Sequence, residues 1–226
     1  MKICGFLPLT LLDFPGRTAC TVFTSGCNLR CPYCHNAAIA RSDAPTIEES
    51  ELFDFLNRRR GLLDGVCISG GEPLLQSDLP DFIRKIKEQG FAIKLDTNGT
   101  LPIEDLLAAG LVDYIAMDLK NSLEEYPKTI GADGFNAAVL LKNIEALRNS
   151  GAEYEFRTTM VRELHTSASL RSLASIIRPD EKWFLQQYRG QNTGNEWSLS
   201  AFSVAEMTGF QAELAGFVPL VELRGI

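Results

Sequence analysis

Three cysteines close together near the start of the chain offer the clearest chemistry in the sequence. Cys27, Cys31 and Cys34 are spaced CxxxCxxC, so three thiolates on one short segment can converge on a soft metal centre. A cubane iron–sulfur cluster normally takes four cysteines, so three neighbouring ligands predict a cluster with one iron left open. Zinc is an alternative, although structural zinc usually takes four ligands, and plain core or redox thiols are another.

Three further short motifs each follow a predicted strand. They are Gly70 to Pro73 (GGEP), Asp96 to Gly99 (DTNG) and Asp118 to Lys120 (DLK). Each motif is also compatible with an ordinary turn, in which glycine or proline sets the backbone angles and the charges are solvated. In parallel sheets, however, the carboxyl ends of the strands carry the active site, and all of these motifs fall there. We therefore interpret the motifs and the cysteines as one candidate site.

The elements that must position these motifs alternate between strands and helices. We predict strands at residues 20–24, 66–69, 91–96, 112–118, 153–160 and 182–188, with a further one at 217–223. We predict helices at residues 47–60, 79–89, 102–109, 135–149, 167–177 and 203–214. Thr46 and Glu49 are expected to form a capping box, and Asp78 is expected to cap the second helix.

This alternation limits the fold class. Six βα units of roughly 30 residues predict a parallel sheet with helices outside it. Right-handed crossovers leave either a doubly wound open sheet or a barrel, and a full barrel needs about 250 residues. No linker or repeat interrupts the pattern over the 226 residues, so we expect a single domain spanning residues 1–226.

Composition excludes several classes of function. The chain has 22 Lys and Arg against 29 Asp and Glu, a net charge of −7, which argues against a nucleic-acid partner. No apolar run is long enough to span a membrane. The apolar run from Ile3 to Leu12 imitates a signal peptide but ends in a charged turn, Asp13 to Arg17, instead of a cleavage site. Together with the clustered cysteines, this predicts a protein of the reducing cytoplasm.

The cysteine triplet followed by GGEP resembles the radical S-adenosylmethionine (SAM) superfamily over nearly the whole chain. The resemblance implies an α/β fold, a partial (βα)6 TIM-like barrel with parallel strands and outer helices. It also implies that Cys27, Cys31 and Cys34 hold one [4Fe-4S] cluster, whose open iron is chelated by the amine and carboxylate of SAM. The GGEP segment would then bind the methionyl amino group, and Tyr33 would lie near the adenine.

Finer features resemble the activating enzymes of glycyl-radical proteins. The Cys34–His35–Asn36 continuation and the DTNG and DLK segments match theirs. The resemblance implies that Lys120 contacts the cofactor, and that Asp96, Thr97 and Asp118, with the backbone of Ala116, hold a monovalent cation near its carboxylate. The implied cofactor-binding residues are Tyr33, Cys34, His35, Gly70, Gly71, Glu72, Asp96, Asn98, Asp118, Leu119 and Lys120.

The opening segment, Leu11 to Cys20, most resembles the activating proteins of anaerobic ribonucleoside-triphosphate reductase. In the implied reaction the reduced cluster passes one electron to SAM, which splits into methionine and a 5′-deoxyadenosyl radical. That radical then takes a hydrogen atom from a glycine of the partner enzyme. A low-potential flavodoxin or ferredoxin is the implied electron donor. Many such enzymes carry extra clusters, but Cys67 is the only cysteine after the triplet, so we expect no second cluster.

Two other classes of function remain open. One is a radical SAM enzyme acting on a small molecule, such as 7-carboxy-7-deazaguanine synthase; those proteins tend to carry Cys-Asp-Thr where this chain has Cys34–His35–Asn36. An uncovered barrel also favours a partner protein, because a small-molecule site needs walls that exclude water. The other class is a non-catalytic iron–sulfur or zinc module, which leaves GGEP, DTNG and DLK unexplained.

Three features outside the motifs have more than one interpretation. Arg157 shares a strand face with Glu153 and Glu155, which predicts either a polar barrel interior or an ion-pair ladder. His165 is expected to be a structural histidine with satisfied ring nitrogens, and the alternative is a cofactor contact. The polar segment 191–197 is expected to be a simple loop, and the alternative is a docking site for a partner.

Overall fold

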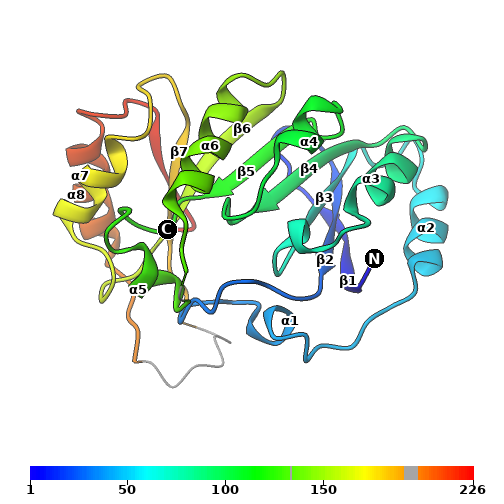
Figure 1. Ribbon diagram of the computed structural model, residues 1–226, viewed down its shortest axis with the longest axis horizontal. Coiled ribbons are helices and arrows are strands. Elements are labelled where there is room, and N and C mark those ends of the chain that lie inside the picture. Colours follow the sequence, from blue (N-terminus) through cyan, green and yellow to red (C-terminus); the bar gives the residue numbers. More distant parts are fainter. Residues whose placement is uncertain (133, 191–197) are drawn as a thin grey trace. The chain divides into compact units, whose positions relative to one another are not determined.

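The computed structural model describes residues 1–132, 134–190 and 198–226. Within these residues eight strands form one sheet, in the spatial order β1 to β8 (Figure 1). The α/β class with a largely parallel sheet is therefore confirmed. The segment 191–197 lies outside the described residues, so neither interpretation of it is tested.

The strands fall close to their expected positions. Their bounds are β1 Ile3–Thr10, β2 Ala19–Thr24, β3 Gly65–Gly70, β4 Ala92–Thr97, β5 Tyr114–Asp118, β6 Glu153–Met160, β7 Trp183–Gln187 and β8 Val221–Arg224. The pairs β2–β3, β3–β4, β6–β7 and β7–β8 are parallel, as the alternating pattern predicts.

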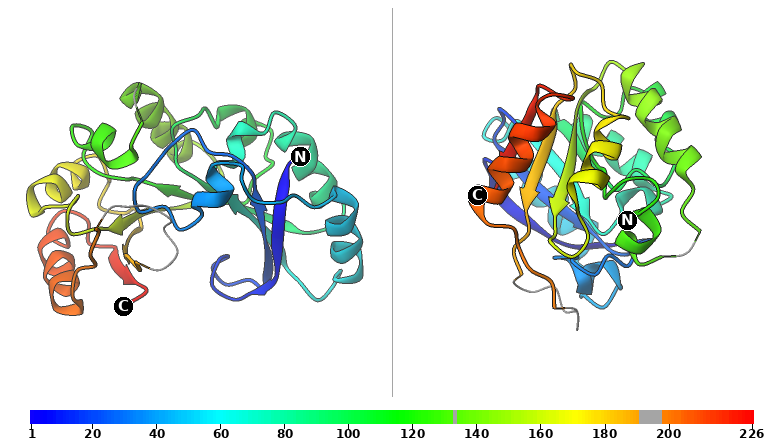
Figure 2. Two further views of the ribbon diagram at one scale, coloured as in Figure 1. Left: turned by 90° about the horizontal axis from the view of Figure 1, so that it is seen from below. Right: turned by 90° about the vertical axis from the view of Figure 1, so that its left-hand side faces the viewer.

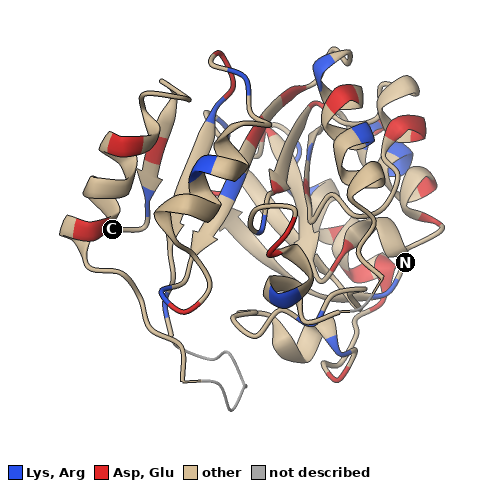
Figure 3. Cartoon of the chain, turned by 60° about the vertical axis from the view of Figure 1, so that its left-hand side comes forward, with Lys and Arg blue, Asp and Glu red and all other residues tan. Residues whose placement is uncertain are grey.

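The helices are α1 Ala37–Ala40, α2 Glu49–Arg58, α3 Leu79–Lys87, α4 Glu104–Ala108, α5 Tyr126–Ile130, α6 Ala137–Arg148, α7 Ser167–Ala174 and α8 Val204–Leu214, with a 3₁₀ turn at Pro73–Leu75. Among these described helices, none has the length and apolar character that crossing a bilayer requires. Acidic and basic residues both occur on α2, α3 and α6, whereas α8 carries Glu206 and Glu213 without a Lys or Arg (Figure 3).

The first strand was not predicted, and it corrects the expectation of an all-parallel sheet. β1 pairs with β2 in the antiparallel direction, with Phe6 opposite Val22. The apolar run of β1 imitates a signal peptide, although Gly5, Pro8 and Thr10 interrupt it. Pro8, which has no N–H donor, is tolerated because β1 lies at the edge of the sheet, and Gly5 adjoins a shift in the register between β1 and β2.

One helix start also differs from its prediction. The N-cap of α2 is Glu48, and no side chain caps it, so the capping box of Thr46 and Glu49 is wrong. The Glu49 carboxylate instead binds the amino group of Met1, which also lies 2.6 Å from the carboxylate of Asp78. Asp78 does occupy the N-cap position of α3, but its side chain makes no cap hydrogen bond. Both acids are therefore used by the N-terminus.

The described chain divides into two compact units. Unit 1 contains residues 1–28, 36–116 and 138–153, and unit 2 contains residues 29–35, 117–137 and 154–226. Both units are discontinuous in the sequence, and the expectation of a single domain stays a prediction.

Each unit has its own core. The core of unit 1 contains buried side chains of α2 and α3, such as Leu52, Phe82 and Ile83. It also contains fully buried residues of β3 and β4, such as Ile68. In unit 2 the helix α8 contacts β7, β8 and α7 (Figure 2). Trp183 of β7 is fully buried there, and its indole N–H donates to the hydroxyl of Thr158 at 2.9 Å.

Candidate functional site

The three clustered cysteines are reduced thiols with partial exposure. Cys27, Cys31 and Cys34 are all half-buried, whereas Cys20 and Cys67 are buried. In unit 2 the backbone N–H of Cys34 donates to the carbonyl of Cys31 at 3.1 Å, which closes a turn. In the described part of the chain, no three His, Cys, Asp or Glu side chains surround the position of a single metal ion. Cluster thiolates bind different iron atoms, so the ligand assignment of these cysteines stays a prediction.

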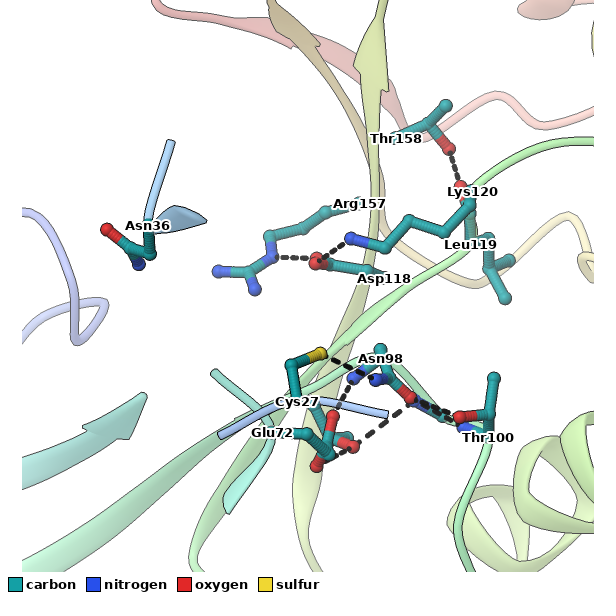
Figure 4. A network of polar contacts seen from close by, with 12 residues as sticks. Cys27, Asn36, Glu72, Asn98, Thr100, Asp118, Leu119, Lys120, Arg157 and Thr158 are labelled. Carbon is teal, nitrogen blue, oxygen red and sulfur yellow. Dashed lines mark hydrogen bonds and ion pairs between the residues drawn. The ribbon is translucent and has the colours of Figure 1, made fainter. Parts of the chain in front are cut away.

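In unit 1 the DTNG motif lies against the first cysteine. The amide nitrogen of Asn98 donates to Cys27 Sγ at 3.9 Å and to Asn28 Oδ1 at 2.9 Å (Figure 4). Thr100 holds Asn98 in place, because its N–H and hydroxyl donate to Asn98 Oδ1 at 2.9 and 2.6 Å. A donor fixed in this way stabilises negative charge on the sulfur. The structure therefore brings Asn98 and Cys27 together, as the sequence interpretation requires.

The glycines of GGEP lie against the chain's own backbone. A Cβ atom on Gly71 would lie 1.9 Å from the carbonyl oxygen of Gly26, and one on Gly70 would lie 2.3 Å from the nitrogen of Thr24. Gly70 also has a φ of +116°, which side chains rarely adopt. The carbonyl of Gly70 accepts from the amide of Asn36 at 3.2 Å, which ties the Cys-His-Asn continuation to this turn. Close backbone packing thus accounts for both glycines and leaves a contact with a ligand as a prediction.

Glu72 is fully buried and its carboxylate is occupied within unit 1. It accepts from the N–H of Leu74 at 3.1 Å, the hydroxyl of Thr97 at 2.9 Å and the N–H of Asn98 at 2.7 Å. These bonds join the turn after β3 to the turn after β4. The structure therefore makes Glu72 a brace that positions Asn98.

Asp96 lies beside a lysine that the sequence interpretation did not include. Its Oδ1 forms an ion pair with the ammonium of Lys94, two residues earlier on β4. Alternate residues of a strand share one face, so this partner carries a sequence signal, the Lys-x-Asp spacing. Thr97, the next residue, is buried with its hydroxyl on Glu72.

In unit 2 the carboxylate of Asp118 joins two cations. Its Oδ1 accepts from Arg157 Nε at 2.8 Å, and its Oδ2 lies 2.7 Å from Lys120 Nζ (Figure 4). The carboxylate of Glu155 binds Arg224 at 2.7 Å, and Arg157 reaches the end of β5. The two interpretations of the strand face that carries Glu153, Glu155 and Arg157, an ion-pair ladder and a polar barrel interior, stay predictions.

The backbone of the DLK motif is held by β6. The N–H of Leu119 donates to the carbonyl of Arg157 at 2.8 Å, and the carbonyl of Leu119 accepts from the hydroxyl of Thr158 at 2.7 Å. Leu119 is itself buried. These bonds fix the direction in which Lys120 leaves the strand.

In unit 2 the ammonium of Lys120 lies near the aromatic ring of Tyr33. Lys120 Nζ lies 6.0 Å from the centre of the Tyr33 ring. Burial opposes the charge of Lys120, but the negative charge of Asp118, which also accepts a hydrogen bond from Lys120, outweighs it and holds the pKa of Lys120 well above its ordinary value. Burial raises the pKa of Tyr33 well above its ordinary value, so the ring stays a neutral phenol. Lys120 is therefore a fixed cation beside a neutral aromatic ring.

The two histidines differ in their surroundings. His165 is buried, and Lys120 O accepts from its Nε2 at 2.8 Å while Nδ1 accepts from Val161 N–H at 3.1 Å. Burial lowers the pKa of His165, and the prediction of a structural histidine with satisfied nitrogens is confirmed. His35 packs edge-on against Tyr188, with ring centres 5.9 Å apart, and burial with the charge of Arg189 lowers its pKa. Its contact with a cofactor stays a prediction.

Each unit contributes thiols of the kind that an iron–sulfur cluster takes as ligands. In unit 1 the thiol of Cys27 is half-buried and the amide of Asn98 donates toward it, and in unit 2 the thiols of Cys31 and Cys34 are half-buried. In unit 2 the hydroxyl of Tyr33 is buried with no hydrogen-bond partner among the described residues. An unsatisfied buried hydroxyl beside a fixed ammonium is a site that a polar ligand can complete.

Comparison with known proteins identifies relatives of the chain. The family model described as the radical SAM superfamily matches residues 21–165. A Methanocaldococcus jannaschii protein named as a glycyl-radical enzyme activating enzyme is 31% identical over 203 residues, 86% of this chain and 82% of its own length. The pyruvate formate-lyase-activating enzyme of Clostridium pasteurianum is 34% identical over 190 residues, 78% of this chain and 76% of its own.

The name of a third relative refers to a different partner enzyme. The anaerobic ribonucleoside-triphosphate reductase-activating protein of Escherichia coli is 34% identical over 91 residues, 38% of this chain and 58% of its own. Among solved structures, a domain of pyruvate-formate lyase-activating enzyme from Bacteroides vulgatus has a TM-score of 0.56 at 19% identity. That likeness covers 71% of this chain and 99% of the domain. The expected partial barrel of strands with outer helices is thereby confirmed as the fold.

Proposed function

Because the chain belongs to the radical SAM superfamily and is a radical SAM enzyme, we propose that it generates a glycyl radical on a partner enzyme. The observation that carries the proposal is the identity to a named activating enzyme over most of both chains. The half-buried thiols of Cys27, Cys31 and Cys34 support it, because a cluster needs accessible soft ligands.

The chain's own residues would bind and orient the reacting groups. A bound [4Fe-4S] cluster and SAM supply a one-electron reductive cleavage to methionine and a deoxyadenosyl radical, which takes one hydrogen atom from a partner glycine. Cys27, Cys31 and Cys34 are the proposed ligands, and the amide of Asn98 donates toward the sulfur of Cys27 at 3.9 Å. Hydrogen bonds to cluster sulfurs raise the reduction potential, so this contact would favour electron uptake.

Unit 2 would supply contacts to SAM. The ammonium of Lys120, held by Asp118 at 2.7 Å, is a fixed positive charge for a carboxylate. The buried Tyr33 hydroxyl offers one donor, and its ring an apolar face for adenine. Membership of the superfamily implies both the iron–sulfur cluster and SAM, whereas these individual contacts are part of the proposal.

We propose anaerobic ribonucleoside-triphosphate reductase as the partner and a low-potential flavodoxin or ferredoxin as the electron donor, both in the cytoplasm. The opening segment Leu11 to Cys20 and the Escherichia coli relative support this choice. The Clostridium pasteurianum relative names pyruvate formate-lyase, so that enzyme is the second partner to assay.

An anaerobic assay tests the proposal. The protein is reconstituted with iron and sulfide, reduced and given SAM, with and without each partner enzyme; 5′-deoxyadenosine is quantified and the glycyl radical is followed by electron paramagnetic resonance. We expect a radical doublet only with the partner. It should vanish in Cys31→Ala and persist in the matched control Cys4→Ala, a half-buried thiol outside the triplet.

The possible results are distinct. SAM cleavage without a radical on either protein would contradict the activating role and indicate a small-molecule substrate. An absence of both cluster and cleavage would contradict radical SAM chemistry in this chain.

A further inference from the structure

A buried lysine lies on the face of β4 that carries the DTNG aspartate in unit 1. The side chain of Lys94 is only 2% exposed. Lys94 pairs in register with Cys67 of β3, and its Nζ lies 3.8 Å from Cys67 Sγ and 5.9 Å from the centre of the Tyr114 ring. Its strongest contact is the ion pair with Asp96 Oδ1. The ammonium is thus enclosed by a carboxylate, a thiol and an aromatic face, which are all groups that attract a cation.

Burial of a lysine side chain at this position costs free energy unless its ammonium is paired with a negative charge. Lysine is almost never fully buried without a partner, because removing its ammonium from water is expensive. The groups around Lys94 repay this cost only while Asp96 carries its negative charge. Conversely, Asp96 is largely buried, with its side chain 15% exposed, and gains a counter-charge that cannot diffuse away.

The residues that were expected to bind a monovalent cation already have other partners in this arrangement. Asp96 was expected to hold such an ion, yet its carboxylate already binds an ammonium that belongs to the chain. In unit 2 the other expected carboxylate, Asp118, is paired with Arg157 and Lys120. Thr97 is likewise engaged, since its hydroxyl donates to Glu72.

We propose that the Lys94 ammonium is the resident cation of Asp96 and takes the place of a monovalent metal ion. Lys94 is then a positioning residue: it neutralises Asp96 and fixes the start of the segment that carries Asn98. The relevance to SAM binding rests on the proposed function, but the occupancy of Asp96 does not. The thermal stability of the wild-type protein should therefore depend on neither sodium nor potassium.

Thermal unfolding of the protein without cluster or SAM tests the proposal independently of activity. The midpoint is measured in potassium, sodium or choline chloride at one ionic strength. We expect the three salts to give the same midpoint for the wild type. Lys94→Ala should lower it by about 6 °C or more, because the variant breaks a buried ion pair, and should regain part of the loss as potassium or propylammonium is titrated.

Lys94→Met is the matched control, because its neutral chain fills the space and leaves no room for an ion. It should lose stability without recovery in either cation. The Lys94→Met/Asp96→Asn double variant should recover part of the loss, since the unpaired carboxylate is gone.

Two results would overturn the proposal. One is a saturable gain in the wild-type midpoint with potassium or sodium over choline, a measurement that needs no variant. The other is a Lys94→Ala protein that responds to neither potassium nor propylammonium, which would leave Lys94 a packing residue. Failure of SAM cleavage in the holoenzyme would contradict the proposed function and leave these salt measurements unaffected.

Discussion

The Glu72 brace gives a prediction whose size follows from the hydrogen bonds. Its Oε1 accepts from Leu74 N–H and the Thr97 hydroxyl, and its Oε2 accepts from Asn98 N–H. Glu72→Gln keeps the shape but leaves only one acceptor oxygen. The two backbone donors use different oxygens, so either orientation of the new amide leaves one buried N–H unsatisfied.

The expected loss of stability is considerable. A buried unsatisfied donor costs about 1–3 kcal/mol, and each of the two remaining bonds loses about 1 kcal/mol when its acceptor is no longer charged. The free energy of unfolding should therefore fall by about 3–5 kcal/mol. For a chain of this size that corresponds to a thermal midpoint lower by about 6–20 °C.

The assay is urea unfolding and thermal unfolding of the purified protein, followed by circular dichroism. The control is Glu88→Gln, the same change at an exposed residue of unit 1, which should lie within about 0.5 kcal/mol of the wild type. A Glu72→Gln protein within about 1 kcal/mol of the wild type, at an unchanged denaturant slope, would refute the brace.

Two other predictions concern single positions. Gly71→Ala should lose about 1–3 kcal/mol or more, because its methyl group would meet Gly26 O at 1.9 Å, whereas Gly151→Ala, with nothing within 4 Å, should be nearly neutral in the same unfolding assay. His165 has a pKa below its ordinary 6.5, so the unfolded chain binds more protons and stability should fall as pH drops below about 6.5. Midpoints measured between pH 7.5 and 5 should depend less on pH in His165→Gln; an unchanged dependence would contradict the assignment.

Local patterns predicted most of the strands and helices, because alternating apolar runs are encoded within each segment. β6 begins at Glu153 and ends at Met160, as predicted, whereas the capping box predicted for Thr46 and Glu49 does not form. β1 was missed because its edge position, which tolerates Pro8, is a property of the assembled sheet.

In the candidate site, too, the local motifs were predictable from the sequence and their contacts were not. The spacing of the cysteines, GGEP, DTNG and DLK is visible in the sequence, whereas their partners depend on register between strands. Arg157 binds Asp118 because of where β6 lies beside the end of β5, which no local pattern encodes. Lys94 is the exception, since its two-residue spacing from Asp96 on one strand was available as a signal.

The hydroxyl of Tyr33, which has no hydrogen-bond partner among the described residues, implies a trade-off between stability and affinity. A buried polar group without a partner costs the empty protein about 1–3 kcal/mol. A ligand that accepts its hydrogen bond relieves that cost on binding, and 1.4 kcal/mol corresponds to about a tenfold gain in affinity. The free protein is thereby less stable than a phenylalanine would make it, and the difference is recovered only in the complex.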